Sequence, residues 1–302
     1  MTEKKRSTTA GITEKLISLG TIDKGAILTE VILEYRKHKG DKKKYSLPLF
    51  MKMSKSLKEQ TFDKMQIFYL NEEENTDYTI IYLHGGAYVN EMMVFHWMML
   101  ENISSKLQSY IIVPDYGLAP LHDFKEAYRD LTDLYVQYRQ KHPHKKIVLM
   151  GDSAGGGLAI GLAQYWHANN IEQPYKIISL SPWLDLTMTN PDIEKYIHVD
   201  PMLKVDELKV DSQYWANGTD LHDYRLSPIY GNIQGLHDIY LFVGTHEIFY
   251  PDVTKFYNRL KDNHIKTELF IGEGLNHVYP AFPIPEAKQA LDTIVQIIKD
   301  EK

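Results

Sequence analysis

Short apolar runs alternate with amphipathic stretches along most of the chain from about residue 64. The apolar runs predict seven strands, several of them apolar almost throughout, as expected for strands buried on both faces: Gln66–Leu70, Tyr78–Leu83, Tyr110–Val113, Ile147–Met150, Lys176–Leu180, Ile239–Val243 and Thr267–Ile271. Apolar residues at helical spacing predict helices at 92–108, 123–141, 154–168, 205–216, 252–262 and 285–299. Strands that alternate with helices indicate an α/β fold with a mostly parallel sheet covered by helices.

The strongest chemical signal is the segment Gly151–Gly156, which has Ser153 at its third position. A predicted strand precedes it and a predicted helix follows it, which is the context of a G-x-S-x-G nucleophile elbow. Small residues on both sides allow the strand and the helix to approach around a serine held in a strained turn. The alternative is a glycine-rich helix start that binds phosphate, but the segment lacks the further Gly and Lys of a phosphate-binding loop.

The chain contains no cysteine, which excludes a disulfide framework, a cysteine-based metal site and a cysteine nucleophile. A covalent catalyst built on this sequence would therefore use another nucleophile, and Ser153 is the expected one.

A second glycine pair lies in the segment His84–Tyr88, directly after the predicted strand Tyr78–Leu83. Glycines allow backbone N–H groups to face a site, which suits an oxyanion hole for a developing negative charge. We expect the N–H groups of Gly85, Gly86 and Ala154 to form it, Ala154 being the residue after the serine. Taken alone, the segment is equally compatible with an ordinary turn at the end of a strand.

A serine nucleophile requires a base and an acid that orients the base, in the chain order serine, acid, histidine. His277 is the expected base, because it follows the last predicted strand in a glycine-rich loop. Glu247 is the expected acid, a few residues past the end of the preceding strand. Asp252 stays open as the alternative, although its position beside Pro251 equally fits the N-cap of the next helix.

Together these motifs resemble the bacterial branch of the hormone-sensitive lipase family of α/β-hydrolases. The matching segments follow one another from about residue 64 to 300: His84–Tyr88, Asp115–Pro120, Gly151–Gly156, Ser181–Trp183, Ser227–Gly231, Gly244–Glu247 and His277. The resemblance implies the α/β-hydrolase fold, and it assigns the nucleophile to Ser153, the base to His277 and the oxyanion hole to the glycine pair. The family usually has Asp where this chain has Glu247, and it often has Arg where this chain has Gly117. The second departure concerns local packing and not the chemistry.

Two regions depart from the alternation of strands and helices. Residues 1–60 are predicted to be helical, and residues 188–226 form a polar insertion longer than a plain connection. The resembling family has a cap built from an N-terminal segment and an insertion of this kind. We therefore expect a single domain over 1–302, in which these two pieces cover a catalytic core of about 61–187 and 227–302.

The expected function is hydrolysis of carboxylic esters, with short acyl chains implied by the resemblance and with no cofactor and no metal. The expected partner is a small-molecule ester. The alternatives are a lipase acting at a lipid surface, a peptidase or amidase with the same triad, and a non-enzymatic ligand receptor. Aromatic and methionine side chains near the site in sequence fit either an acyl pocket or the core: Tyr88, Met92, Met93, Phe95, Trp97 and Trp183.

The net charge of −6 argues against a nucleic-acid binder, but the charge is uneven along the chain. Residues 1–60 contain 14 Lys/Arg and 7 Asp/Glu, a net of +7, which leaves −13 on the rest. The basic segment is interpreted as solvated helix faces, or as a lid that attracts anionic substrates or lipid surfaces. The most apolar stretch, Met92–Leu100, is far shorter than the roughly 20 residues that span a bilayer. With no targeting signal visible, we expect a cytoplasmic protein without stable membrane insertion, and the sequence leaves a homodimer open.

Overall fold

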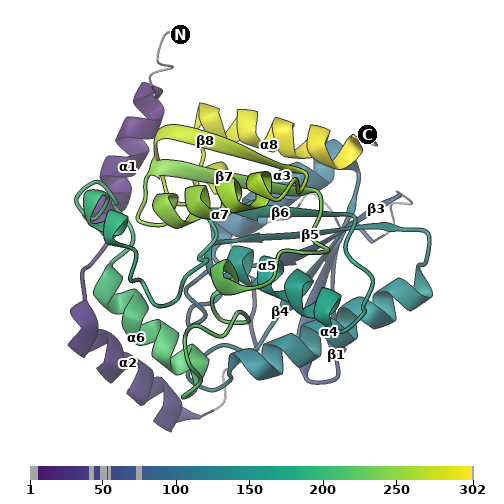
Figure 1. The fold of residues 1–302 in the computed structure, drawn as a ribbon, viewed down its shortest axis with the longest axis horizontal. Coiled ribbons are helices and arrows are strands. Elements are labelled where there is room, and N and C mark those ends of the chain that lie inside the picture. Colours follow the sequence, from purple (N-terminus) through teal and green to yellow (C-terminus); the bar gives the residue numbers. More distant parts are fainter. Residues whose placement is uncertain (1–5, 41–43, 48–52, 54–55, 73–76, 301–302) are drawn as a thin grey trace.

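A single eight-stranded sheet organises the chain in the computed structural model, which describes residues 6–40, 44–47, 53, 56–72 and 77–300 (Figure 1). The strands are β1 (Leu57–Phe62), β2 (Met65–Leu70), β3 (Tyr78–Leu83), β4 (Tyr110–Asp115), β5 (Lys146–Asp152), β6 (Lys176–Leu180), β7 (Ile239–His246) and β8 (Thr267–Asn276). Their order across the sheet is β1-β2-β4-β3-β5-β6-β7-β8. The pairs β1–β2 and β2–β4 are antiparallel, and all other neighbours are parallel, so the predicted mostly parallel α/β sheet is confirmed.

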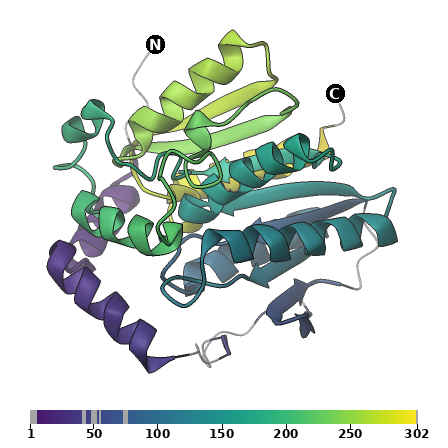
Figure 2. The same ribbon diagram turned by 60° about the horizontal axis from the view of Figure 1, so that its bottom comes forward.

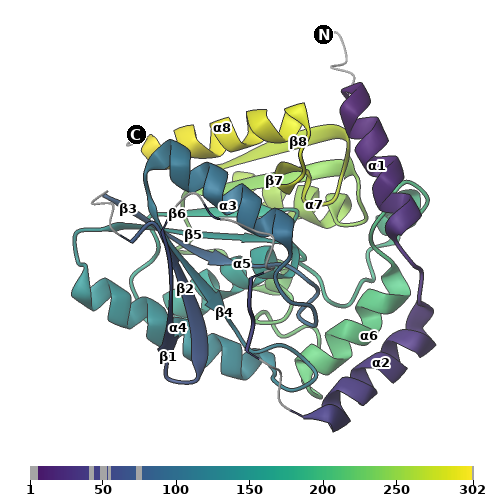
Figure 3. The same ribbon diagram turned by 180° about the vertical axis from the view of Figure 1, so that it is seen from behind.

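Helices cover both faces of this sheet. They are α1 (Thr8–Gly20), α2 (Gly25–Lys39), α3 (Val94–Leu107), α4 (Phe124–Lys141), α5 (Ser153–Ala168), α6 (Val205–Ala216), α7 (Tyr250–Asp262) and α8 (Pro285–Lys299). One apolar cluster joins the sheet to α3 and α8, and another joins it to α4, α5 and α7, which gives three layers (Figures 1 and 3). None of the described helices is long and apolar enough to cross a membrane.

Two boundaries differ from the sequence prediction. The expectation of helix through residue 60 is wrong at Leu57–Phe62, which pairs with β2 as the outermost strand of the sheet. Its central residues are polar and exposed, as is common on an edge strand, so the apolar signal of a strand is weak there. Strand β8 continues to Asn276 instead of ending at Ile271. His277 therefore follows a strand end directly and does not lie in a glycine-rich loop.

The N-terminal helices and the insertion lie beside each other at one side of the sheet (Figure 2). Helix α2 packs on α6, and the Tyr214 hydroxyl donates to Glu34 at 2.6 Å across that contact. Arg36 of α2 donates to the carbonyl oxygen of Val89 at 2.8 Å. Asp200 of the insertion accepts the N–H of Ile248 at 2.9 Å. These contacts join both pieces to segments next to the predicted catalytic residues.

Candidate active site

Ser153 is the first residue of α5 and follows β5 without an intervening loop. Its φ of 52° lies in the left-handed region, so the serine occupies the strained turn expected of a nucleophile elbow. The two flanking glycines are explained by contact distances. A Cβ on Gly151 would lie 2.4 Å from the carbonyl oxygen of Gly155, and a Cβ on Gly155 would lie 2.1 Å from that of Leu83. No larger residue fits at either position without displacing backbone.

The structure brings Ser153, His277 and Glu247 into one series of hydrogen bonds. His277 Nε2 lies 2.9 Å from Ser153 Oγ, and His277 Nδ1 lies 2.5 Å from Glu247 Oε2. An ionised carboxylate can only accept, so the proton of the neutral ring is on Nδ1 and Nε2 is free to accept from the serine hydroxyl. All three residues are buried, and each follows the carboxyl end of a parallel strand: β5, β7 or β8.

Glu247 is held by partners other than the histidine. Its Oε1 accepts from the Ser181 hydroxyl at 2.7 Å and from the N–H of Gly244 at 2.7 Å. The Ser181 oxygen also accepts the N–H of Val278 at 3.0 Å, so one side chain joins the acid to the residue after the histidine. Sequence reasoning matched Ser181 only as part of a family motif and assigned it no role.

Asp252, the alternative acid, is hydrogen-bonded to Asn190, whereas His277 is paired with Glu247. It is in the first turn of α7, where the N-cap is Phe249, so the expectation that Asp252 is the cap is wrong. Its Oδ1 accepts from the side-chain amide of Asn190 at 2.7 Å. Burial raises the pKa of Asp252 to about 6. The geometry therefore favours Glu247 as the acid partner of His277.

The charge around His277 favours its protonated form. Burial alone would lower the pKa of His277, but the negative charge and hydrogen bond of Glu247 outweigh it. Asp200 and Asp152 add to this effect, and the pKa of His277 lies above its ordinary value. A base of this kind is poised to take and then return a proton near neutral pH.

The glycine pair requires one correction. The N–H of Gly85 donates to Asp152 Oδ1 at 2.8 Å, so it is not available for an oxyanion. Gly86 has a φ of 123°, which favours glycine, and a Cβ there would lie 2.5 Å from the carbonyl oxygen of Asn90. In the described part of the chain no acceptor is recorded for the N–H groups of Gly86 and Ala154. The following residue, Ala87, is likewise without a recorded acceptor and has a φ of 54°.

A second set of contacts, made by His84 and Tyr116, supports the segment that carries the glycine pair. His84 Nδ1 lies 2.7 Å from the carbonyl oxygen of Gly85, and the Tyr116 hydroxyl donates to the carbonyl oxygen of His84 at 2.7 Å. Burial lowers the pKa of His84 to about 4, so its ring is neutral at neutral pH and donates from Nδ1. Tyr116 stacks on that ring with centroids 4.7 Å apart.

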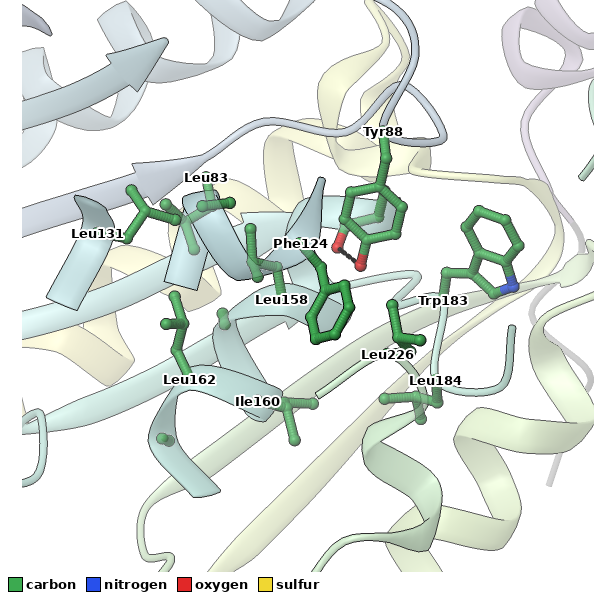
Figure 4. Close-up of a cluster of buried hydrophobic side chains, with 14 of the residues drawn as sticks. Leu83, Tyr88, Phe124, Leu131, Leu158, Ile160, Leu162, Trp183, Leu184 and Leu226 are labelled. Atoms are coloured by element: carbon green, nitrogen blue, oxygen red, sulfur yellow. Dashed lines mark hydrogen bonds between the residues drawn. The ribbon is translucent and has the colours of Figure 1, made fainter. Parts of the chain in front are cut away.

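The aromatic residues that fit either an acyl pocket or the core lie in two groups. Trp97 of α3 belongs to the core cluster on that side of the sheet, where its indole N–H donates to the Tyr45 hydroxyl at 2.9 Å, so the core alternative holds for it. Tyr88 and Trp183 lie in the opposite core cluster, on the side of α5 (Figure 4). Trp183 also stacks on Phe249, whose ring meets His277 edge-on with centroids 5.2 Å apart. Phe249 is a residue near the site that the sequence did not single out.

A serine, a histidine and a carboxylate at the carboxyl ends of parallel strands, under helices on both faces, define the α/β-hydrolase class of proteins. The family described as the α/β-hydrolase fold matches residues 80–281, and the chain belongs to it. In the described residues no group of three or more His, Cys, Asp or Glu is arranged to hold a metal ion.

Known relatives indicate which activity within this class the chain has. An esterase of Acinetobacter venetianus is 29% identical over 221 residues, which cover 72% of this chain and 73% of the relative. The crystal structure of an esterase candidate from Staphylococcus aureus has a TM-score of 0.88 and 29% identity, with 93% of this chain and 95% of that one covered. An esterase of the bacterial hormone-sensitive lipase family, at 24% identity, has the same fold with a TM-score of 0.82 over 98% of each chain. The protein is a carboxylic ester hydrolase of the α/β-hydrolase family, as the sequence motifs predict.

Proposed function

We propose that the protein is a serine carboxylesterase in which Ser153, His277 and Glu247 form the catalytic triad. The observation that carries this proposal is the series of hydrogen bonds from Ser153 Oγ through both ring nitrogens of His277 to Glu247. The strained backbone of Ser153 supports it, because strain of this kind is typical of functional positions.

In the proposed reaction His277 Nε2 takes the hydroxyl proton as Ser153 Oγ attacks the ester carbonyl carbon. The negative charge on the carbonyl oxygen is stabilised by the N–H groups of Gly86 and Ala154, with Ala87 as a further candidate donor. Protonated His277 then gives its proton to the departing alcohol, and water attacks the acyl-enzyme by the same route. Glu247 keeps the ring oriented and stabilises the imidazolium. No step requires a cofactor.

Short-chain acyl esters are the proposed substrates. Ser153 and His277 are only 7% and 3% exposed, and the buried rings of Trp183 and Phe249 occupy space near His277. Hydrolysis of p-nitrophenyl esters from acetate to palmitate tests this: kcat/KM should be highest for acetate or butyrate. A highest kcat/KM on palmitate would overturn the proposed chain-length preference.

The division into core and cap belongs to the same proposal. We propose one domain, with a cap formed by α1, α2 and the insertion 188–226 over a core that contains the whole sheet. The N-terminal part of the cap then ends before Leu57, where β1 begins. A cytoplasmic location and a homodimer stay predictions.

One observation favours the lipid-surface alternative. The helices α1 and α2 and the short connection between them expose eight large apolar side chains: Ile12, Leu16, Leu19, Ile22, Ile27, Leu28, Val31 and Tyr35. Side chains of this kind beside lysines are found on helices that lie in a membrane interface. Sedimentation with phosphatidylcholine–phosphatidylserine vesicles that persists at high salt would support a lipase; a protein that stays in the supernatant would support the esterase.

A further inference from the structure

A buried carboxylate lies directly behind the candidate active site, on the residue that precedes Ser153. Asp152 is 1% exposed, and its two oxygens accept from three donors on different parts of the fold. Oδ1 accepts the Tyr82 hydroxyl of β3 and the N–H of Gly85, and Oδ2 lies 3.2 Å from His96 Nε2 in α3. Tyr82 and His96 are equally buried. Asp152 therefore joins the nucleophile elbow, the glycine loop and a helix on the other face of the sheet.

The tautomer of His96 follows from its second contact. The N–H of Met93 donates to His96 Nδ1 at 3.0 Å, so Nδ1 carries no proton. The ring proton is therefore on Nε2, which donates to Asp152. The pattern leaves the carboxylate as acceptor from all three groups.

Burial alone would raise the pKa of Asp152. The nearby His96 and the hydrogen bonds from His96, Tyr82 and Gly85 outweigh burial, and the pKa of Asp152 lies below its ordinary value. The carboxylate is therefore ionised at neutral pH, and its donors meet a full negative charge.

The glycine loop and the elbow are in close contact at Gly85. A Cβ on Gly85 would lie 2.3 Å from Asp152 Oδ2 and 2.9 Å from Ser153 Cβ. Because the N–H of Gly85 is fixed to the residue before the nucleophile, the direction of the next peptide is set relative to Ser153. That next peptide carries the N–H of Gly86, which faces the oxyanion in the proposed reaction.

We propose that Asp152, held by Tyr82 and His96, is a positioning residue. It fixes the glycine loop, which carries Gly85 and Gly86, against the nucleophile through the N–H of Gly85. The inference rests on the proposed esterase mechanism and adds to it three residues that do not touch the substrate. A carboxylate is suited to this role because hydrogen bonds to an ionised acceptor are shorter and stronger than neutral ones. A displacement of about 1 Å at the reacting atoms can cost on the order of 100-fold in rate.

A second consequence separates this role from simple packing. The negative charge of Asp152 is one of the groups that raise the pKa of His277, after Glu247 and Asp200. The ring packs against Phe249, which carries no charge, and its remaining hydrogen-bond partner is Ser153. Removing the Asp152 charge should move the acid limb of the kcat/KM profile to lower pH, whereas removing the Tyr82 hydroxyl should leave that limb in place.

The test compares Tyr82→Phe and Asp152→Asn on p-nitrophenyl acetate, with Tyr135→Phe as the matched control. Tyr135 is also buried and its hydroxyl donates one hydrogen bond, to the carbonyl oxygen of Glu172 at 3.0 Å, far along the chain from the loop. We expect kcat to fall about 10-fold in Tyr82→Phe and about 100-fold in Asp152→Asn, with KM within about threefold. The control should lose a similar amount of thermal stability and keep its kcat.

Three results would overturn the positioning role. They are a kcat within threefold of wild type in folded Tyr82→Phe, an equal loss of kcat in Tyr135→Phe, and an acid limb that is unmoved in folded Asp152→Asn. If Asp152→Asn does not fold, Tyr82→Phe and the control still decide. The proposed function is judged separately on the wild type, by its ester hydrolysis and by labelling of Ser153.

Discussion

Replacing Glu247 with glutamine exchanges one carboxylate oxygen for an NH₂ group at a fully buried position. Glu247 Oε1 accepts from Ser181 and from the N–H of Gly244, so the glutamine oxygen will keep that place. The new NH₂ group then faces His277 Nδ1, where the carboxylate oxygen lies at 2.5 Å in the native protein. An NH₂ group donates, so the ring must carry its proton on Nε2 instead of Nδ1.

The size of the effect follows from this tautomer. With the proton on Nε2, the ring has no lone pair at the 2.9 Å contact with Ser153 Oγ and cannot accept the hydroxyl proton. A triad with the wrong tautomer loses about 10⁴ in kcat, which is about 5 kcal/mol of barrier. The pKa of His277 should also fall, because Glu247 is the main group that raises it. Since the neutral ring is the active form, the acid limb of the residual activity should move to lower pH.

The assay is p-nitrophenyl acetate hydrolysis by Glu247→Gln between about pH 5 and pH 9, where histidine titrates. Asp252→Asn is the matched control, because it also replaces a buried carboxylate that accepts from an amide. We expect the control to stay within about threefold of wild type. A Glu247→Gln enzyme within tenfold of wild type, or a crippled Asp252→Asn enzyme, would refute the assignment of the acid.

Two further predictions concern stability. Gly155→Ala should abolish folded, active protein, because its Cβ would lie 2.1 Å from the backbone oxygen of Leu83. Gly11→Ala in α1, where the Cβ would meet no atom outside its own helix nearer than 3.8 Å, should raise the free energy of unfolding by about 0.5–1 kcal/mol. Urea unfolding of both variants checks this, and a soluble, active Gly155→Ala enzyme would contradict it. Burial and the charge of Glu207 raise the pKa of Asp211 to about 7, so the folded state binds the extra proton and stability falls as pH rises from about 4 to about 7. Asp211→Asn should therefore raise the unfolding free energy by on the order of 4 kcal/mol near pH 8 and by little near pH 4. Equal gains at the two pH values would refute the titration.

The sequence predicts the helices well because their periodicity is strong. Helices α4, α7 and α8 begin and end within a residue or two of the predicted ranges, and the amphipathic pattern is clear in each. Strand β1 is missed because Lys58, Glu59 and Gln60 are exposed on an edge and carry no apolar alternation. The extra length of β8 is missed because Gly272 and Gly274 are typical of a loop, although here they continue the strand.

At the site, motifs and chain order predict which residues come together but not every hydrogen-bond partner. Ser153, His277 and Glu247 are brought together as expected, because each follows the end of a parallel strand. The sequence motif predicts that the N–H of Gly85 faces an oxyanion. In the structure this N–H donates to Asp152, and no sequence pattern indicates that contact. The role of Ser181 cannot be predicted from the sequence for the same reason. It depends on contacts with Glu247 and Val278, which lie 66 and 97 positions further along the chain.

The central claim is that Ser153 is the nucleophile of an esterase, and covalent labelling tests it most directly. The full chain is treated with a fluorophosphonate, digested and analysed by mass spectrometry, beside the Ser153→Ala variant. We predict one adduct, on the peptide that carries Ser153, loss of ester hydrolysis in proportion to labelling, and no adduct in the variant. A label on another residue, or full esterase activity in Ser153→Ala, would contradict the account.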